Sequence, residues 1–253
     1  MKVDVILPAG GRISGELAEA AGTDVKALFR IGGKTMLERT LEVVRATGRT
    51  SRIVVVGPPE VVPYAEGLAD VVLPETGSGS QNILQGLEWL SAVNGEEHAL
   101  IVTTDLPFVT PDALNGFLDA CPPQLDLCVP VITRQEFEVR FSRSAARYAR
   151  LRDGEWLIGC AVLVRPAAVV SNRSLFDRVF AARRSKLAMV RLLGPSFVLR
   201  FLTRRLTIRQ IEAKALDILG CTGSAIRACA PELAFDIDYP EDYHHAVARW
   251  QLA

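Results

Sequence analysis

Short runs of aliphatic and β-branched residues alternate with longer helix-like segments along most of this chain. The runs with the pattern of a strand are 2–7, 27–31, 53–56, 71–73, 99–103, 127–132 and 160–164. Segments with helical periodicity lie between them, at 36–47, 80–93 and 111–120. Strands that alternate with helices of this length form right-handed βαβ units. The sequence therefore predicts an α/β fold with a mainly parallel sheet.

The first strand-like run ends in a turn of small residues. Val3–Leu7 is followed by Pro-Ala-Gly-Gly at 8–11 and then by Arg12. Glycine has no Cβ, so a ligand can approach the main-chain N–H groups of such a turn. Ligands of parallel sheets bind at the carboxyl ends of the strands. The turn is thus a candidate phosphate site, although a plain strand-to-helix turn fits it equally well when it is taken alone.

Three aspartates have the spacing of a metal site. Asp105 comes just after the 99–103 run, where an ionised carboxylate needs water or a metal. Asp236 and Asp238 are two residues apart, so on an extended segment they share one face. Oxygen ligands without histidine suit Mg²⁺ or Mn²⁺ better than Zn²⁺. The plain alternative is that these aspartates cap helices or begin turns.

Two cations and a helix add to this pattern. Arg12 and Lys26 can neutralise phosphate charge, and a lysine can also stabilise charge that develops during transfer. Asn82 and Gly86 lie one turn apart on the expected helix 80–93, where they would bring an amide and open backbone to a base or ribose. In isolation Lys26 could be solvated and Asn82 could bond locally. Together, in this order, the residues predict a site for a nucleoside triphosphate and its metal.

Two other nucleotide motifs fail on spacing. Gly33-Lys34-Thr35 has the ending of a P-loop, but Leu28 stands where the first glycine is needed. Residues 10–15 lack the G-x-G-x-x-G spacing of a dinucleotide site. A hydride-transfer function is therefore not expected.

Residues 165–214 differ in charge from the rest of the chain. They contain ten arginines and two lysines against only two acids, yet they are rich in apolar residues. We expect two or three amphipathic helices here, broken at 194–195 and at Gly220. Three interpretations stay open: a helical cap with a solvated basic face, a pocket for an anionic acceptor, and a surface that touches anionic lipid. Arginine pairs at 183–184 and 204–205 suit phosphates in either of the last two cases.

Composition limits the class of protein. The formal net charge is zero, so nothing global attracts the chain to nucleic acid. The five cysteines are odd in number and form no C-x-x-C pair, which favours reduced thiols. We find no signal sequence and no apolar run long enough for a membrane span. We expect a cytoplasmic protein that could form a homo-oligomer, with one domain over 1–253 and a basic helical insertion at 165–230.

The motifs together resemble those of the MobA-like NTP transferase family. This family belongs to the nucleotidyltransferase superfamily, and its members are similar to molybdenum cofactor guanylyltransferases and to the cytidylyltransferases of sugar and isoprenoid metabolism. The matching segments are 7–12, 26–28, 33–38, 82–86, 104–107 and 236–242. The resemblance implies a single Rossmann-like domain that transfers an NMP from an NTP to a phosphorylated acceptor, releases pyrophosphate and uses Mg²⁺ or Mn²⁺.

The resemblance also implies roles for individual residues. The nucleotide would be bound by Leu7, Ala9, Gly10, Gly11, Arg12, Lys26, Asn82, Gly86 and Asp105. Lys26, Arg12 and Asp105 would be catalytic, and the metal would be held by Asp105, Asp236 and Asp238. The loop departs from the family pattern, which usually has a second glycine and arginine soon after the first pair and a proline before the lysine. This altered loop supports the alternative of a non-catalytic nucleotide-binding regulatory or scaffold protein.

Overall fold

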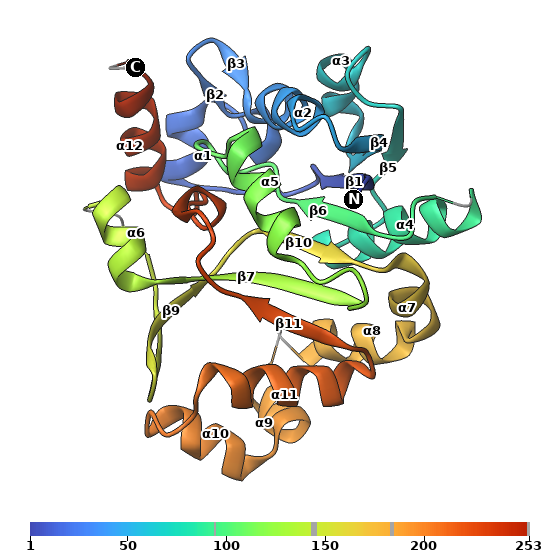
Figure 1. The fold of residues 1–253 in the computed structure, drawn as a ribbon. Coiled ribbons are helices and arrows are strands. Elements are labelled where there is room, and N and C mark those ends of the chain that lie inside the picture. Colours follow the sequence, from blue (N-terminus) through green and yellow to red (C-terminus); the bar gives the residue numbers. More distant parts are fainter. Residues whose placement is uncertain (94, 143–145, 183–184, 252–253) are drawn as a thin grey trace.

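The computed structural model describes residues 1–93, 95–142, 146–182 and 185–251, and its centre is a nine-stranded sheet (Figure 1). The strands are β1 (Val3–Pro8), β4 (Thr50–Gly57), β5 (Val71–Pro74), β6 (Ala99–Val102), β7 (Leu127–Thr133), β8 (Ala149–Leu151), β9 (Gly154–Ile158), β10 (Ala161–Val164) and β11 (Gly223–Ile226). Their order is β5-β4-β1-β6-β10-β7-β9-β8, with β11 paired to β7. Among these strands only β9 and β10 run against the others. The predicted α/β, mainly parallel fold is confirmed.

Helices cover both faces of the sheet. They are α1 (Glu16–Ala21), α2 (Met36–Ala46), α3 (Val62–Ala65), α4 (Gly79–Ala92), α5 (Pro111–Ala120), α6 (Arg134–Arg140), α7 (Pro166–Ser171), α8 (Arg173–Ala182), α9 (Lys186–Leu193), α10 (Pro195–Leu202), α11 (Ile208–Leu219) and α12 (Pro240–Gln251). Short 3-10 turns lie at Lys26–Leu28, Pro59–Val61 and Pro231–Leu233.

The central strand β1 divides two apolar cores. Its side chains alternate between the two faces of the sheet, as in any strand. Val5 and Leu7 are buried in a core that also contains residues of α2 and α5, such as Leu41 and Phe117. Ile6 is buried in the other core, with residues of α4, α7 and α8. Burial on both faces explains why β1 is apolar at successive positions from Val5 to Leu7.

One predicted strand is mostly wrong. Residues 27–31 were expected to be extended, but Lys26–Leu28 forms a 3-10 turn, closed by the N–H of Phe29 donating to the carbonyl of Lys26. Only Arg30–Ile31 is a strand (β2), paired with Lys34–Thr35 (β3) in a small hairpin. The helix after it is as predicted, because Thr35 and Glu38 form a reciprocal capping box at the start of α2.

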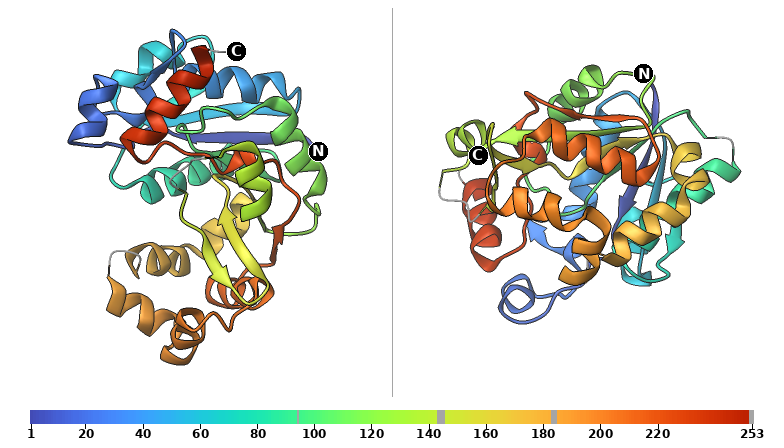
Figure 2. Two further views of the ribbon diagram at one scale, coloured as in Figure 1. Left: turned by 90° about the vertical axis from the view of Figure 1, so that its left-hand side faces the viewer. Right: turned by 90° about the horizontal axis from the view of Figure 1, so that it is seen from below.

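The basic region forms more helices than the two or three predicted. Figure 2 shows α8 to α11 as a lobe at the opposite end of the molecule from α2 and α3. The expected breaks are present, since α9 and α10 are separated at Gly194 and the left-handed Gly220 ends α11. The arginine pair at 183–184 lies outside the described residues. None of the described helices is long and apolar enough to cross a membrane.

Candidate active site

A cavity of about 660 Å³ lies at the carboxyl ends of β1 and β6. This is the edge at which parallel sheets bind ligands, and the volume is typical of a small-molecule site. Its lining comes from the glycine turn, the start of α4, the end of β6, helix α8 and the tail. These residues are Pro8, Gly10, Gly11, Arg12, Ile13, Lys26, Ser78, Gly79, Ser80, Ile83, Thr103, Thr104, Asp105, Phe180 and Asp238.

The glycine turn presents main-chain donors to this cavity. The N–H of Ala9 is used, since it donates to the carbonyl of Val56 over 2.7 Å. The N–H groups of Gly10, Gly11 and Arg12 donate to no other residue in the part of the chain that the structure describes. Unpaired amides in a turn form an anion site.

Gly10 has a steric reason to lack a side chain. A Cβ there would lie 2.2 Å from Oε2 of Glu75 and 2.7 Å from Nδ2 of Asn82. At Gly11 the nearest atoms are those of Lys26, at an ordinary 3.8 Å. A side chain at position 10 would therefore displace the Glu75 carboxylate and the Asn82 amide, whereas one at position 11 would meet only ordinary contacts.

Helix α4 points its N-terminus at the same cavity. Ser78, Gly79 and Ser80 all line it, and Gln81 fixes the first turn by accepting the N–H of Ser78 over 2.8 Å. The first N–H groups of a helix lack intrahelical partners and carry partial positive charge. This fourteen-residue helix therefore adds a second anion-binding element beside the glycine turn.

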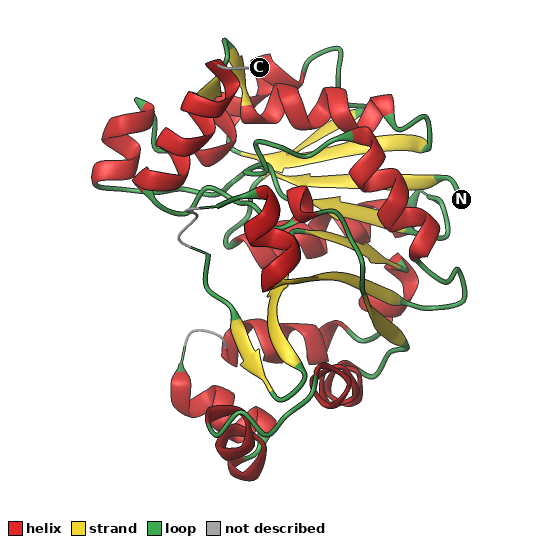
Figure 3. Cartoon of the chain, turned by 60° about the vertical axis from the view of Figure 1, so that its left-hand side comes forward, coloured by secondary structure: helices red, strands yellow, loops and turns green. Residues whose placement is uncertain are grey.

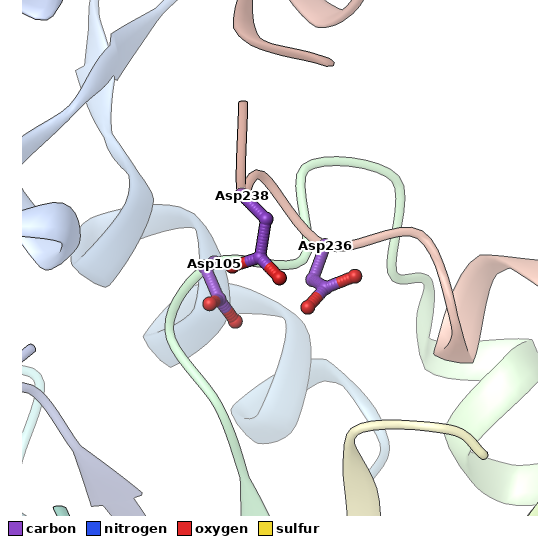
Figure 4. A group of neighbouring side chains, drawn as sticks. All are labelled: Asp105, Asp236 and Asp238. Carbon is purple, nitrogen blue, oxygen red and sulfur yellow. The ribbon is translucent and has the colours of Figure 1, made fainter. Parts of the chain in front are cut away.

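The three predicted aspartates converge beside these donors. One ligand atom from each of Asp105, Asp236 and Asp238 lies within 4.8 Å of the others, and Figure 4 shows their carboxylates facing one another. Asp105 follows β6, whereas Asp236 and Asp238 lie on the segment before α12.

The backbone explains why the tail aspartates reach Asp105. The N–H of Ile237 donates to the carbonyl of Asp105 over 3.1 Å, which fixes the tail against the end of β6. The side chain of Ile237 is fully buried. Since side chains alternate along extended backbone, Asp236 and Asp238 face away from that core and toward the cluster.

Lys26 joins this cluster and partly balances its charge. Its Nζ lies 3.0 Å from Oδ2 of Asp105 and 2.7 Å from Oδ1 of Asp238. Burial lowers the pKa of Lys26, but the two carboxylates raise it more, so its pKa lies above the ordinary value. The pKa of Asp236 is raised to about 7. The main cause is burial, and repulsion from Asp105 and Asp238 adds to it. The described residues of the cluster thus carry an excess of negative charge.

The cluster fits a divalent cation. Oδ1 of Asp105 is buried and has no hydrogen-bond partner among the described residues, and a buried carboxylate oxygen needs a donor or a metal. The available ligands are all carboxylate oxygens, the donors that Mg²⁺ and Mn²⁺ prefer. Asp105, Asp236 and Asp238 are the residues that could hold such an ion.

Arg12 is held by acids in this structure. Its guanidinium lies 2.8 Å from Asp24, 3.0 Å from Glu60 and 3.9 Å from Glu75. Arg12 lines the cavity all the same. A phosphate would compete chiefly with Asp24 and Glu60, whose exposed carboxylates form weak ion pairs.

Four of the predicted nucleotide-binding residues do not line the cavity. Leu7 and Ala9 are fully buried in the core beneath the turn. Asn82 is also buried, and its Oδ1 accepts the N–H of Thr76 over 3.1 Å. Gly86 does not offer open backbone, because it packs against Ile6: a Cβ there would lie 3.0 Å from Cγ2 of Ile6. The close packing of α4 on β1 explains why residue 86 is glycine.

Sequence reasoning assigned no role to Asp242, which supports the aspartate cluster. This carboxylate is buried and accepts the N–H groups of Asp238 (3.3 Å) and Tyr239 (3.1 Å). It therefore orients the tail segment that carries Asp238. The Asp-Tyr-Pro-Glu-Asp order predicted a helix start, and an acid two positions past the proline could have been recognised as the group that caps it.

A mostly parallel sheet whose strand ends carry a glycine turn, a lysine and clustered aspartates defines a class of protein, the nucleotidyltransferases. The chain belongs to the MobA-like NTP transferase domain family, which matches residues 5–194. The resemblance seen in the sequence is therefore confirmed, and the protein is by family a transferase. Among curated proteins no sequence matches this chain.

Solved structures agree with this assignment. A hypothetical transferase from Thermus thermophilus is 34% identical, with a TM-score of 0.83, over 96% of this chain and 100% of that one. A 2-C-methyl-D-erythritol 4-phosphate cytidylyltransferase, also from Thermus thermophilus, is 20% identical, with a TM-score of 0.59, over 99% and 100%. A CMP:2-keto-3-deoxy-manno-octonic acid synthetase solved with CTP is 16% identical, with a TM-score of 0.61, over 100% and 99%. The last two share the fold.

Proposed function

We propose that the protein transfers a nucleoside monophosphate from an NTP to a phosphorylated small molecule and releases pyrophosphate, in a reaction that requires Mg²⁺ or Mn²⁺. The observation that carries this proposal is the convergence of Asp105, Asp236 and Asp238 next to Lys26 and the free amides of the glycine turn.

The donor nucleotide would occupy the 660 Å³ cavity. The amides of residues 10–12 and the N-terminus of α4 would bind the phosphates. An oxygen of the acceptor phosphate attacks the α-phosphorus, and the bond to the bridging oxygen of the β-phosphate breaks. Lys26 would stabilise the negative charge on the transferred group.

The bound metal would supply charge neutralisation at the phosphates. Asp105, Asp236 and Asp238 would hold it, and Asp242 would keep the tail in place through its two backbone hydrogen bonds. Catalysis by this chain's own residues would consist of positioning and electrostatics, as is usual for phosphoryl and nucleotidyl transfer.

The acceptor would occupy a second cavity of about 360 Å³. Asp238 lines both cavities, whereas Asp105 and Lys26 line only the first and Asp236 only the second. The acid cluster thus separates two chambers, as transfer between two bound substrates requires. The second chamber is lined by α6, the segment 146–149, β9 with Cys160, and the tail, and by no described residue of the basic helices α8 to α11. An anionic acceptor could therefore bind there without contact with those helices.

Arg147 is the residue we assign to the acceptor phosphate. It lines the second cavity, and its guanidinium lies 5.3 Å from the ring centre of Tyr239. We expect Arg147→Gln to raise the KM for the acceptor about tenfold, equivalent to one charge-assisted hydrogen bond, and to leave the KM for NTP unchanged. Arg150→Gln, an exposed arginine on β8, is the control. A rise in the KM for NTP instead would place Arg147 in the donor site.

The experiment that tests the proposed function is pyrophosphate release from each of the four NTPs with Mg²⁺ and a panel of phosphorylated acceptors. We expect one NTP and acceptor pair to give turnover, and we expect Asp105→Asn to lower it at least about 100-fold, since charge-stabilising groups contribute about that much. Asp112→Asn, an exposed aspartate in the first turn of α5, should not change it.

Two results would contradict this account. Turnover unchanged in Asp105→Asn would remove Asp105 from the metal site. Stabilisation of the protein by an NTP, without pyrophosphate release for any acceptor, would favour the non-catalytic nucleotide-binding alternative.

A further inference from the structure

Helices α9 and α10 expose apolar side chains that a folded protein normally covers. None of the residues of α9 or α10 is buried, although most of them are aliphatic or aromatic. Leu187 is 59% exposed, Leu199 62% and Leu202 70%. Leu199 and Leu202 are three positions apart and therefore lie on one face of α10. Helices α9 and α10 pack against each other, and exposed apolar side chains gathered on neighbouring helices indicate a binding surface.

The same two helices are basic. Neither Asp nor Glu occurs between residues 178 and 211. No carboxylate of the described chain lies within ion-pair distance of Lys186, Arg191 or Arg200. Elsewhere in the lobe, by contrast, Arg173 pairs with Glu88 and Asp177. The apolar surface is thus bordered by cations whose charge is not balanced within the described protein.

The place of these helices makes them accessible. In Figures 2 and 3 they lie at the far end of the molecule from α2 and α3, beyond the lower edge of the sheet. The donor cavity is lined by Phe180 of α8 and by no residue that the structure describes in α9 or α10. A surface could therefore cover α9 and α10 without contact with the acid cluster.

We propose that α9 and α10 dock the enzyme on membranes that contain anionic lipid. The leucines enter the boundary between head groups and acyl chains, and Lys186, Arg191 and Arg200 bind lipid phosphates at head-group level. A short helix with apolar residues on one face and arginines beside them has this interfacial pattern. A bilayer accepts projecting side chains without a shaped groove, whereas a protein partner would have to supply one.

The charges also argue against a second copy of this chain as the occupant. If α9 and α10 packed on the same helices of another copy, two surfaces without an acid from 178 to 211 would face each other. Like charges at such an interface are costly. An anionic lipid surface provides the complementary charge.

Co-sedimentation of the full chain with vesicles tests the proposal. We expect binding to phosphatidylcholine vesicles that contain about 30% phosphatidylglycerol, weaker binding at about 0.5 M salt, and none to phosphatidylcholine alone. We expect L199S/L202S to weaken binding at least about tenfold. We expect R191Q/R200Q to weaken it about 25-fold, because each cation near the surface contributes about fivefold.

Matched controls lie outside the lobe. V62S/V139S removes two exposed apolar residues of α3 and α6, and K34Q/R45Q removes two exposed cations; both should bind like the unaltered protein. Thermal unfolding by circular dichroism checks that each variant folds.

Three results would overturn the proposal: no binding of the unaltered protein to the anionic vesicles at low salt, equal binding of L199S/L202S, or equal binding to phosphatidylcholine alone. Sedimentation velocity could give a fourth result that overturns the proposal. A dimer that L199S/L202S converts to a monomer would assign the surface to a second copy.

Discussion

At the scale of single residues, the site is defined by an imbalance of charge. Three carboxylates share a space in which Lys26 balances part of their charge. Burial raises the pKa of Asp236 most, and repulsion from the other two carboxylates adds to this, so that its pKa is about 7. A carboxyl group whose pKa is higher in the folded than in the unfolded protein costs stability as it ionises. The folded state binds more protons between about pH 4 and pH 7, so the free energy of unfolding should fall as pH rises through this range.

This imbalance predicts that Asp236→Asn stabilises the metal-free protein. The substitution removes the charge that the fold disfavours, so the free energy of unfolding at about pH 8 should rise by up to about 4 kcal/mol, while near pH 4 the two proteins should be alike. Urea unfolding at both pH values, with a chelator present, measures this. Asp217→Asn, at an exposed site, is the control. A less stable Asp236→Asn protein at the higher pH would show that the carboxylate is already compensated.

At the scale of elements, two helical glycines have opposite surroundings. Gly86 on α4 packs against Ile6, where a Cβ would lie 3.0 Å from Cγ2. Gly116 on α5 has no atom within 4 Å of its Cβ position among those of the described chain. Alanine is favoured over glycine in a helix by about 1 kcal/mol, but an added methyl in a packed interface costs about 1–3 kcal/mol.

We therefore expect Gly116→Ala to raise the free energy of unfolding by about 1 kcal/mol. We expect Gly86→Ala to lower it or to leave it unchanged, because the overpacking offsets the gain in helix propensity. Chemical denaturation of both variants at one pH gives the comparison. Equal stabilisation by both alanines would mean that α4 has room to move away from β1.

Elements whose pattern is local could be predicted from the sequence. The β4 strand and the start of α2 carry their own signals, a β-branched run in one case and the Thr35–Glu38 capping box in the other. The strands β8, β9 and β11 were not predicted, because their sequences (Ala-Arg-Leu, Gly-Glu-Trp-Leu-Ile and Gly-Ser-Ala-Ile) carry no uninterrupted aliphatic run. In addition, β9 and β11 pair with β7, which is distant from them in the sequence. The antiparallel direction of β10 could not be predicted either. A short apolar run has the same pattern whether the strand is parallel or antiparallel to its neighbours.

At the scale of the whole molecule, the site depends on contacts between distant parts of the chain. Lys26 and Asp238 are 212 positions apart, yet a hydrogen bond of 2.7 Å joins them. Asp105 and the glycine turn could be placed at one edge of the sheet from strand pattern alone. The tail could not, because its position depends on the Ile237–Asp105 hydrogen bond and the burial of Ile237. In the sequence, the two-residue spacing of Asp236 and Asp238 suggested a shared ion, and the family resemblance linked these residues to Asp105.

The molecule is also polarised by charge. The acid cluster lies at the strand ends, and the basic helices α9 and α10 lie in the lobe at the opposite end of the molecule from α2 and α3 (Figure 2). The zero net charge conceals this division. A single chain thus separates a proposed metal and nucleotide site from a proposed lipid surface.

The central claim is that aspartates from mid-chain and tail share one divalent ion next to the glycine turn. A crystal structure with Mn²⁺ and a non-hydrolysable NTP analogue, using the anomalous signal of manganese, tests it most directly. The account predicts an anomalous peak about 2.1 Å from an oxygen of Asp105 and from an oxygen of Asp236 or Asp238, in contact with the phosphates. A manganese peak bound elsewhere, or phosphates placed away from Gly10 and Gly11, would contradict it.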